Sequence, residues 1–209
     1  SRGLGDVYKR QSVDWCYKTE KDASMNNRSI RYPRGKTLGG SSSINGLLYI
    51  RGQSRDYDVW RQLGNTGWGW DDVLPYFIKA ENQERGKDNF HGVGGPLSVS
   101  DQRIQLPLLN EFQNAAEEFG IPKTSDFNTG NNHGCGYFQV TEKDGFRCST
   151  AVGYLNPAKS RKNLHIVTNA HVKKINFDNK IAKDVEYWEG DKLKKVSTSK
   201  EIILSSGSI

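Results

Sequence analysis

A glycine- and serine-rich stretch, PRGKTLGGSSSINGLLYIRG over residues 33–52, constrains the fold of this chain more than any other feature. Gly39-Gly40 lets the backbone approach a ligand without interference from a Cβ atom. Ser41 to Asn45 then offer a serine N-cap and the start of a helix, whose free N–H groups favour an anion or a polarised oxygen. The spacing matches neither a Walker A loop nor a GxGxxG fingerprint. The residues alone therefore leave two interpretations open, a site for a phosphate-bearing cofactor or a glycine-rich turn that caps an ordinary helix.

Two helical patterns are clear elsewhere in the chain. Residues 56–82 are expected to hold two short helices, the second with an apolar stripe that begins at Trp70. Asp71 is a plausible N-cap of that second helix, which would place Pro75 near its first turn. Another helix is expected over about Leu106–Phe119, because Gly120 suits its C′ position and four apolar residues share a face: Leu109, Phe112, Ala116 and Phe119.

Strand patterns dominate the last part of the chain. Leu164–Thr168 and Val172–Phe177 alternate in polarity, and Asp178-Asn179 and Gly190-Asp191 are turn signals. Glu201–Ser205 contains three consecutive apolar residues, which indicates a strand buried on both faces, as in a parallel α/β sheet. A shorter strand is expected at Pro96–Ser100.

Length and composition bound the class of protein. The 209 residues suffice for one or two domains, and no apolar run is long enough to cross a bilayer. The net charge is +6, and the basic residues are spread along the chain without a nucleic-acid-binding motif, so a solvated basic surface is the better interpretation. The densest basic cluster, Lys192–Lys195, is expected at the tip of a hairpin. The three cysteines and four histidines have neither disulfide-framework nor metal-ligand spacing, and the cysteines are expected to be free thiols.

The segment Pro33–Gly52 resembles, over its whole length, the first signature of the glucose–methanol–choline (GMC) oxidoreductases. Several other segments are similar to that family in the same order, and together they cover nearly all of residues 30–209: 56–60, 67–77, His91-Gly92, 95–97, Asp126-Phe127-Asn128, 147–154, 161–173 and 205–209, the last similar to the opening of the second family signature. The resemblance is closest to the choline dehydrogenase and alcohol dehydrogenase branch, and the chain is interpreted as an internal fragment.

The resemblance implies an α/β fold, in which part of a doubly wound FAD/NAD(P)-binding domain is interleaved with part of an α+β substrate domain. The FAD-binding parts are expected at residues 12–82 and 160–209, and the substrate-domain part at residues 83–159. Residues 1–11 do not resemble the family and are interpreted as a non-native or artefactual leader.

The resemblance also implies FAD as the cofactor and assigns residues to it by their position in the family motif. One group is expected along the FAD: Thr37, Gly39, Gly40 and Ser41. A second group is expected to pass the isoalloxazine and ribityl chain through backbone groups: Asn45, Gly46, Leu47 and Leu48. Val172 matches the family position whose backbone reads the adenine ring.

The implied activity is oxidation of choline or another primary alcohol to the aldehyde, by hydride transfer to flavin N5. Glucose dehydrogenase-like sugar oxidation and a GMC-like lyase with structural FAD are the alternatives. The family's catalytic His is expected beyond the C-terminus, so no catalytic residue is assigned and the fragment alone is expected to be inactive. Oxygen, a quinone or another carrier remain open as electron acceptor, no nucleic-acid partner or metal is expected, and the location is expected to be cytoplasmic or peripheral to a membrane.

A few conspicuous residues have less specific interpretations. Trp60 and Trp70 fit helix packing better than substrate stacking. Arg51 could bind a pyrophosphate or form a structural ion pair, and the sequence does not separate the two. His91 matches the family's His-Gly turn ahead of a substrate-domain strand, and His171, beside Val172, is interpreted as a packed or solvent-edge residue. Neither is interpreted as a catalytic base.

Overall fold

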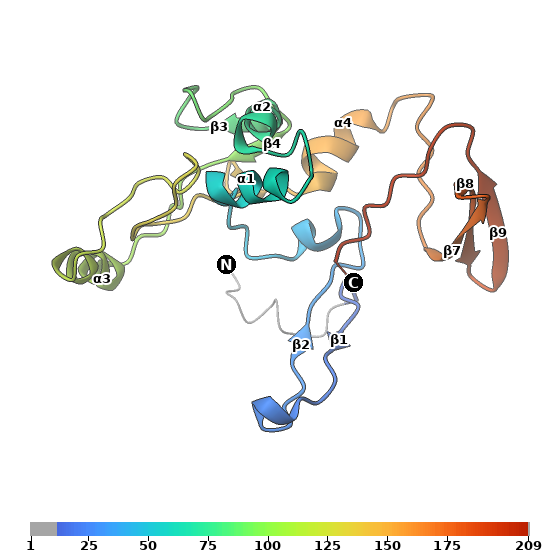
Figure 1. Cartoon of the computed structure of the whole chain (residues 1–209), viewed down its shortest axis with the longest axis horizontal. Helices are drawn as coiled ribbons and strands as arrows, with labels where there is room; N and C mark the ends of the chain where they lie inside the picture. The colour runs from blue at the N-terminus through green and yellow to red at the C-terminus, as the bar shows by residue number, and fades with distance from the viewer. Residues whose placement is uncertain (1–11, 209) are drawn as a thin grey trace. The chain divides into compact units, whose positions relative to one another are not determined.

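The structure is a computed structural model that describes residues 12–208; the predicted leader at residues 1–11 and Ile209 lie outside the described part. Chain contacts divide the protein into two units, one up to Lys159 and one from Ser160 onward. In the described part of the first unit the elements are, in chain order, β1 (Tyr17–Lys18), η2 (Ala23–Met25), β2 (Arg31–Tyr32), η3 (Gly40–Ser43), α1 (Ser54–Gln62), α2 (Trp70–Ala80), β3 (Glu81–Gln83), β4 (Leu97–Val99), α3 (Pro107–Glu118), β5 (Glu142–Lys143), β6 (Phe146–Arg147), η4 (Ala151–Leu155) and α4 (Asn156–Ala158) (Figure 1).

The centre of the first unit is a narrow set of paired strand segments. β3 and β4 pair in parallel, with Glu81 opposite Leu97. The ladder continues beyond β4, because Ser100 and Val140 exchange backbone hydrogen bonds of 2.9 Å. Val140 in turn bridges to Leu48. The end of the glycine-rich motif is thereby attached to the middle of the first unit.

The start of α2 differs from the one predicted from the sequence. The N-cap of α2 is Gly69 and not Asp71, and the Gly69 N–H donates to the carboxylate of Asp72, at N3, at 2.9 Å. Pro75 consequently lies inside α2 rather than near its first turn, where its missing N–H leaves the Asp71 carbonyl without its usual donor. Trp70 is buried and contacts Tyr57 of α1 at a ring distance of 5.8 Å, as expected for a packing residue.

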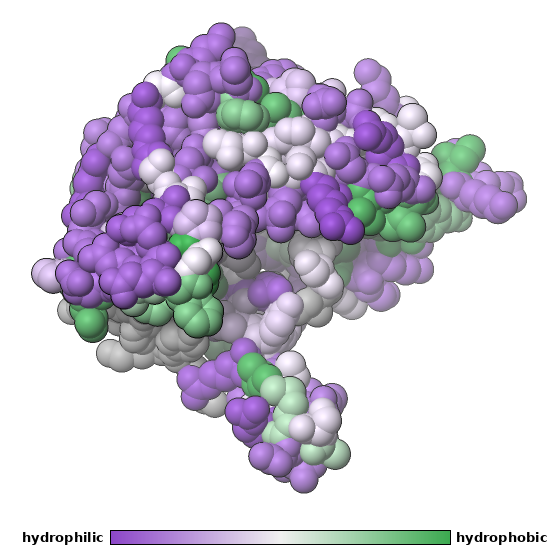
Figure 2. Space-filling model, turned by 60° about the vertical axis from the view of Figure 1, so that its left-hand side comes forward, coloured by the Kyte–Doolittle hydropathy of each residue, from purple (hydrophilic) through white to green (hydrophobic). Residues whose placement is uncertain are grey.

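α3 confirms the predicted helix, with Leu106 as N-cap and Phe119 as C-cap. Gly120 has a φ of 94°, the left-handed conformation expected at C′. The apolar face of α3 is largely uncovered within the described residues, since Phe112 is 66% and Phe119 is 87% exposed. Other apolar side chains also reach the surface, as the scattered green patches on the mainly hydrophilic face in Figure 2 show.

The second unit contains one antiparallel sheet of β7 (Ala170–Asp178), β8 (Ile181–Glu189) and β9 (Lys192–Ser197), in that order (Figure 1). Both predicted turns are confirmed: the first has left-handed residues at Asn179 and Lys180, and the second passes through Gly190. The lysine cluster Lys192–Lys195 does not form the hairpin tip itself but follows it along β9.

Two predicted strands are wrong. Leu164–Thr168 and Glu201–Ser205 have no regular structure, and Ile203 and Leu204 are 77% and 70% exposed. An apolar run becomes a strand only when a neighbouring strand accepts its backbone hydrogen bonds. Neither segment has such a partner among the described residues.

No helix within residues 12–208 is long and apolar enough to span a membrane. The three cysteines are free thiols, and Cys148 is buried. In the same part of the chain, no group of three or more metal-ligating side chains is close enough to hold a metal ion.

Candidate functional site

The glycine-rich motif forms a tight loop around the short helix η3. Gly39 and Gly40 have φ angles of 88° and 53°, and Gly39 is the N-cap. Ser41 is therefore not the N-cap expected from the sequence. It lies one residue inside a single 3-10 turn, and its hydroxyl accepts a hydrogen bond from the Gly35 N–H at 3.2 Å. Gly35 is required at its position because a Cβ atom there would overlap the Gly40 carbonyl.

Hydrogen bonds from residues more than a hundred positions later hold the loop from one side. The Arg147 guanidinium donates to the Ser42 carbonyl at 3.1 Å and to the Asn45 side-chain oxygen at 2.7 Å. Thr150 donates its backbone N–H to the Ser42 hydroxyl at 3.0 Å and its own hydroxyl to the Gly39 carbonyl at 3.2 Å. Burial lowers the pKa of Arg147, but an arginine with a lowered pKa still carries its charge at neutral pH.

The opposite side of the loop is open. Thr37, Ser41, Asn45, Gly46 and Leu48 are exposed, and a Cβ atom added at Gly40 or Gly46 would meet nothing within 4 Å. Leu47 has a φ of 69°, an uncommon conformation for a residue with a bulky side chain. Such backbone strain often accompanies functional sites.

The structure thus gathers most of the predicted site residues into one surface of the first unit: Thr37, Gly39, Gly40, Ser41, Asn45, Gly46, Leu47 and Leu48. Val172 belongs to the second unit, where it is 57% exposed on β7 and pairs with Tyr187. β7 is an edge strand of its sheet, with a register irregularity after Val172.

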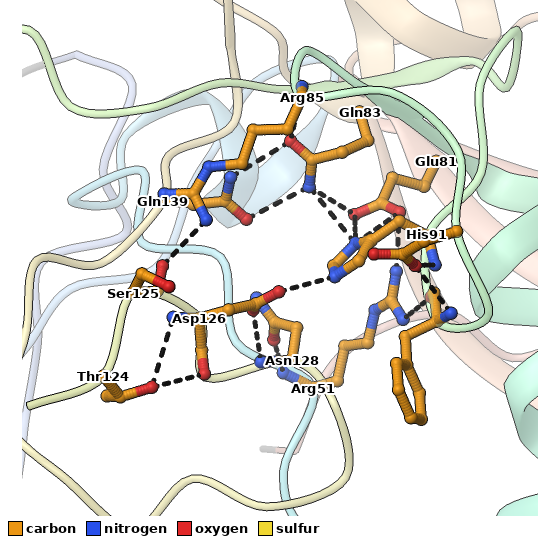
Figure 3. A network of polar contacts seen from close by, with 12 residues as sticks. Arg51, Glu81, Gln83, Arg85, His91, Thr124, Ser125, Asp126, Asn128 and Gln139 are labelled. Carbon is orange, nitrogen blue, oxygen red and sulfur yellow. Dashed lines mark hydrogen bonds and ion pairs between the residues drawn. The ribbon is translucent and has the colours of Figure 1, made fainter. Parts of the chain in front are cut away.

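A buried polar network lies behind the end of the motif, at residues to which the sequence assigned no joint role (Figure 3). The Arg51 guanidinium forms an ion pair of 2.8 Å with Glu81 and donates to the Phe90 carbonyl at 2.6 Å. Both side chains are almost completely buried. Arg51 is accordingly a structural ion-pair partner, one of the two roles left open by the sequence.

His91 is the second cation of this network. Its Nδ1 lies 3.0 Å from the Glu81 carboxylate and its Nε2 lies 2.7 Å from the Asp126 carboxylate. The hydrogen bonds to Asp126 and to Glu81 raise the pKa of His91 to about 9. Burial alone would raise the pKa of Asp126, but the hydrogen bond from His91 holds it below its ordinary value. With both ring nitrogens occupied, His91 is not available as a catalytic base.

The sequence carries a partial signal for these supporting residues. Arg51, His91, Asp126, Asn128, Arg147 and Thr150 all lie in segments that resemble the GMC family. Glu81 and Gln139 lie outside the resembling segments. Glu81 falls at the helical spacing of the apolar stripe that begins at Trp70, whereas no periodicity marks Gln139 as buried. Their role becomes visible only when the chain is folded.

A model of the GMC oxidoreductase family matches residues 16–209 of this chain. The chain belongs to the GMC oxidoreductase family. It is 40% identical over 210 residues to the alcohol dehydrogenase (acceptor) of Pseudomonas putida, which covers 99% of this chain and 38% of that protein. It is also 40% identical over 195 residues to the oxygen-dependent choline dehydrogenase of Sinorhizobium fredii, covering 93% of this chain and 35% of that protein.

A solved structure gives a similar fold. The FAD-dependent oxidoreductase from Chaetomium thermophilum matches with a TM-score of 0.85 at 29% identity, over 96% of this chain and 38% of that one. This likeness, together with the mixture of helices and strands, confirms the α/β fold class. The GMC chain described here therefore spans well under half the length of these relatives.

Proposed function

We propose that this chain is part of an FAD-dependent oxidoreductase that oxidises an alcohol to the aldehyde or ketone. Support comes from the family membership and from relatives named alcohol dehydrogenase and choline dehydrogenase. A solved structure of similar fold is named FAD-dependent. The observation that carries the proposal is the loop at residues 37–48, which is held from one side and open on the other.

The residues present fit the proposed cofactor. A ligand approaching the open side would meet backbone and small side chains, because Gly40 and Gly46 have free space where a Cβ atom would be. The proposed FAD-binding residues are Thr37, Gly39, Gly40, Ser41, Asn45, Gly46, Leu47 and Leu48, with Val172 of the second unit. When bound, FAD supplies the hydride acceptor for alcohol oxidation.

The described residues of this chain would position the cofactor and would not take part in the reaction themselves. Arg147 and Thr150 hold Ser42 and Gly39 from behind, so the loop does not have to rearrange when a ligand binds. We assign no catalytic acid or base, because His91 is occupied by two carboxylates. A proton acceptor for the alcohol would come from outside residues 12–208.

The same proposal covers the domains, partners and location. Residues 12–82 and 160–209 would belong to the FAD-binding domain and residues 83–159 to the substrate domain; the division of contacts after Lys159 supports the second boundary. Choline or another primary alcohol is the proposed substrate, with oxygen, a quinone or another carrier as acceptor. A cytoplasmic or peripheral membrane location is part of the proposal, and cell fractionation tests it.

The test is the visible absorbance of the full-length protein that carries this chain, recorded without oxygen before and after addition of choline or a primary alcohol. Flavin bands that bleach with the alcohol support the proposal, and the substrate that bleaches them fastest identifies the branch. Flavin bands that persist with all alcohols and sugars tested favour a lyase with structural FAD. A purified, folded protein without flavin that takes up no added FAD would refute the proposal.

A further inference from the structure

His91 lies at the centre of a buried cluster with balanced charges. Its two ring nitrogens face carboxylates of Glu81 and Asp126, and a carboxylate only accepts hydrogen bonds. Both ring nitrogens must therefore carry a hydrogen, so the ring is an imidazolium. With Arg51, the cluster holds two cations and two anions.

The cluster reaches the backbone of the glycine-rich motif by two routes that both begin at His91. Through Glu81, His91 meets the Arg51 guanidinium, whose Nε donates to the Tyr49 hydroxyl at 3.1 Å. Through Asp126, it meets Asn128, because the Asp126 carboxylate accepts the Asn128 N–H at 2.7 Å. Asn128 then accepts the Arg51 N–H at 2.9 Å and donates to the Tyr49 carbonyl at 3.3 Å.

A third connection closes the cluster on the same segment. The Gln83 side-chain amide donates to the Glu81 carboxylate at 3.2 Å and to the Gln139 side chain at 3.1 Å. The Gln139 carbonyl accepts the Tyr49 N–H at 2.9 Å. All three connections therefore end at Tyr49 or Arg51, immediately after the residues proposed to bind FAD.

We propose that His91, as an imidazolium between Glu81 and Asp126, is a positioning residue that fixes the segment Tyr49–Arg51 and thereby the conformation of Asn45–Leu48 toward the cofactor. The inference rests on the proposed function. Removing the positive charge would leave two carboxylates with Arg51 as their only buried cation. The strained backbone at Leu47, two residues before Tyr49, would then lose part of the support that maintains it.

The groups that face His91 define its dependence on pH. Glu81 of β3 and Asp126 of the loop after α3 contact the ring, and Arg51 pairs with Glu81. The Asp88 carboxylate accepts the backbone N–H of His91 at 2.7 Å. Arg85 and Asp101 pair with each other beyond Gln139. A neutral His91 could donate from one nitrogen only, so one carboxylate would lose its partner.

The experiment measures the affinity of the full-length protein for FAD at pH values from 6.5 to 10. Bound flavin is first removed, and the binding of added FAD is followed by flavin fluorescence. The wild type is compared with His91→Gln and with the control His133→Gln, whose side chain is exposed. A double variant, His91→Gln with Asp126→Asn, removes one charge of each sign and serves where the single variant does not fold. Circular dichroism establishes that each protein is folded at each pH.

We expect His91→Gln to bind FAD about tenfold more weakly at pH 7, the effect typical of losing a residue that orients a ligand. The FAD affinity of the wild type and of His133→Gln should fall as the pH rises through about 9. The affinity of the His91 variants should not show this fall, because they lack the titrating group. A folded His91→Gln or double variant with wild-type affinity and the wild-type pH profile would overturn the inference. A folded wild type that binds no FAD at any pH would overturn the proposed function and this inference with it.

Discussion

Gly35 and Gly46 lie in the same loop, yet an added methyl group should lower the stability at Gly35 and leave it unchanged at Gly46. At Gly35, a Cβ atom would overlap the carbonyl of Gly40 and lie 2.7 Å from the Ser41 nitrogen. Both obstacles are backbone atoms, which cannot rotate away. At Gly46, a Cβ atom would meet nothing within 4 Å, and its φ is not in the left-handed region.

The magnitudes follow from these surroundings. Forcing an extra methyl group into a packed site costs about 1–3 kcal/mol. For a domain of 150–250 residues, that loss corresponds to a fall in Tm of roughly 2–4 °C per kcal/mol, and a longer protein shifts less. Gly35→Ala should therefore melt several degrees below the wild type. Gly46→Ala should stay within about 0.5 kcal/mol of the wild type, because its methyl group points into open space.

The two variants should differ again when FAD binding is measured. If Gly46 passes the cofactor as proposed, its new methyl group occupies space that the ligand needs, so Gly46→Ala should bind FAD more weakly without losing stability. Differential scanning calorimetry and FAD titration of the full-length protein provide the two measurements. The reasoning would be refuted if Gly35→Ala melted like the wild type, or if Gly46→Ala bound FAD with unchanged affinity.

Three further variants test other parts of the fold. The pKa of His91 rises from 6.5 to about 9 on folding, which corresponds to about 3 kcal/mol of the free energy of unfolding. This stabilisation should be complete below pH 6.5 and be lost as the pH rises through 9. Urea midpoints should therefore fall over that pH range in the wild type but not in His91→Gln. Arg51→Met should lower the free energy of unfolding by about 3–5 kcal/mol, because it leaves Glu81 buried without its guanidinium, and a midpoint equal to that of the wild type would contradict the ion pair. Lys180→Gly should slow hydrogen exchange of the amides in β7 and β8, because the φ of 73° at Lys180 costs a non-glycine residue about 1 kcal/mol. Unchanged exchange would contradict the left-handed conformation of Lys180 in this turn.

Local sequence rules predicted elements whose determinants are close together in the chain. α3 begins and ends where its apolar spacing and Gly120 indicated, and both turns of the β7–β9 sheet follow their Asn and Gly signals. Capping was less exact, because Asp71 and Asp72 are both acceptable at the start of α2 and only the geometry at Gly69 distinguishes them. The motif at residues 33–52 contains the predicted turn and helix start, although the helix is one 3-10 turn capped by Gly39 and not by Ser41.

Features that depend on distant partners were not predictable in this way. Glu201–Ser205 has the composition of a buried strand, but a strand requires a neighbour that its own sequence does not name. The polar network likewise depends on partners that are distant in the sequence. Arg51, Glu81, His91 and Asp126 are separated by ten to thirty-five residues along the chain and share no periodicity. Their sequence contexts marked some of them as resembling a family but did not indicate that they meet.

The network also explains how so short a helix can be held in a defined conformation. η3 has four residues, too few for a helix to be stable by its own hydrogen bonds. A loop that offers its backbone to a ligand cannot be covered by side chains on that side, so its support must come entirely from behind. Arg147 and Thr150 provide that support at one end, and the cluster around His91 provides it at the other. Charged groups suit this task because their hydrogen bonds are strong and directional. In the cluster around His91, burial is tolerated because each cation faces an anion. The loop should therefore loosen from its Tyr49 end when His91 loses its proton, while the Arg147 end stays in place.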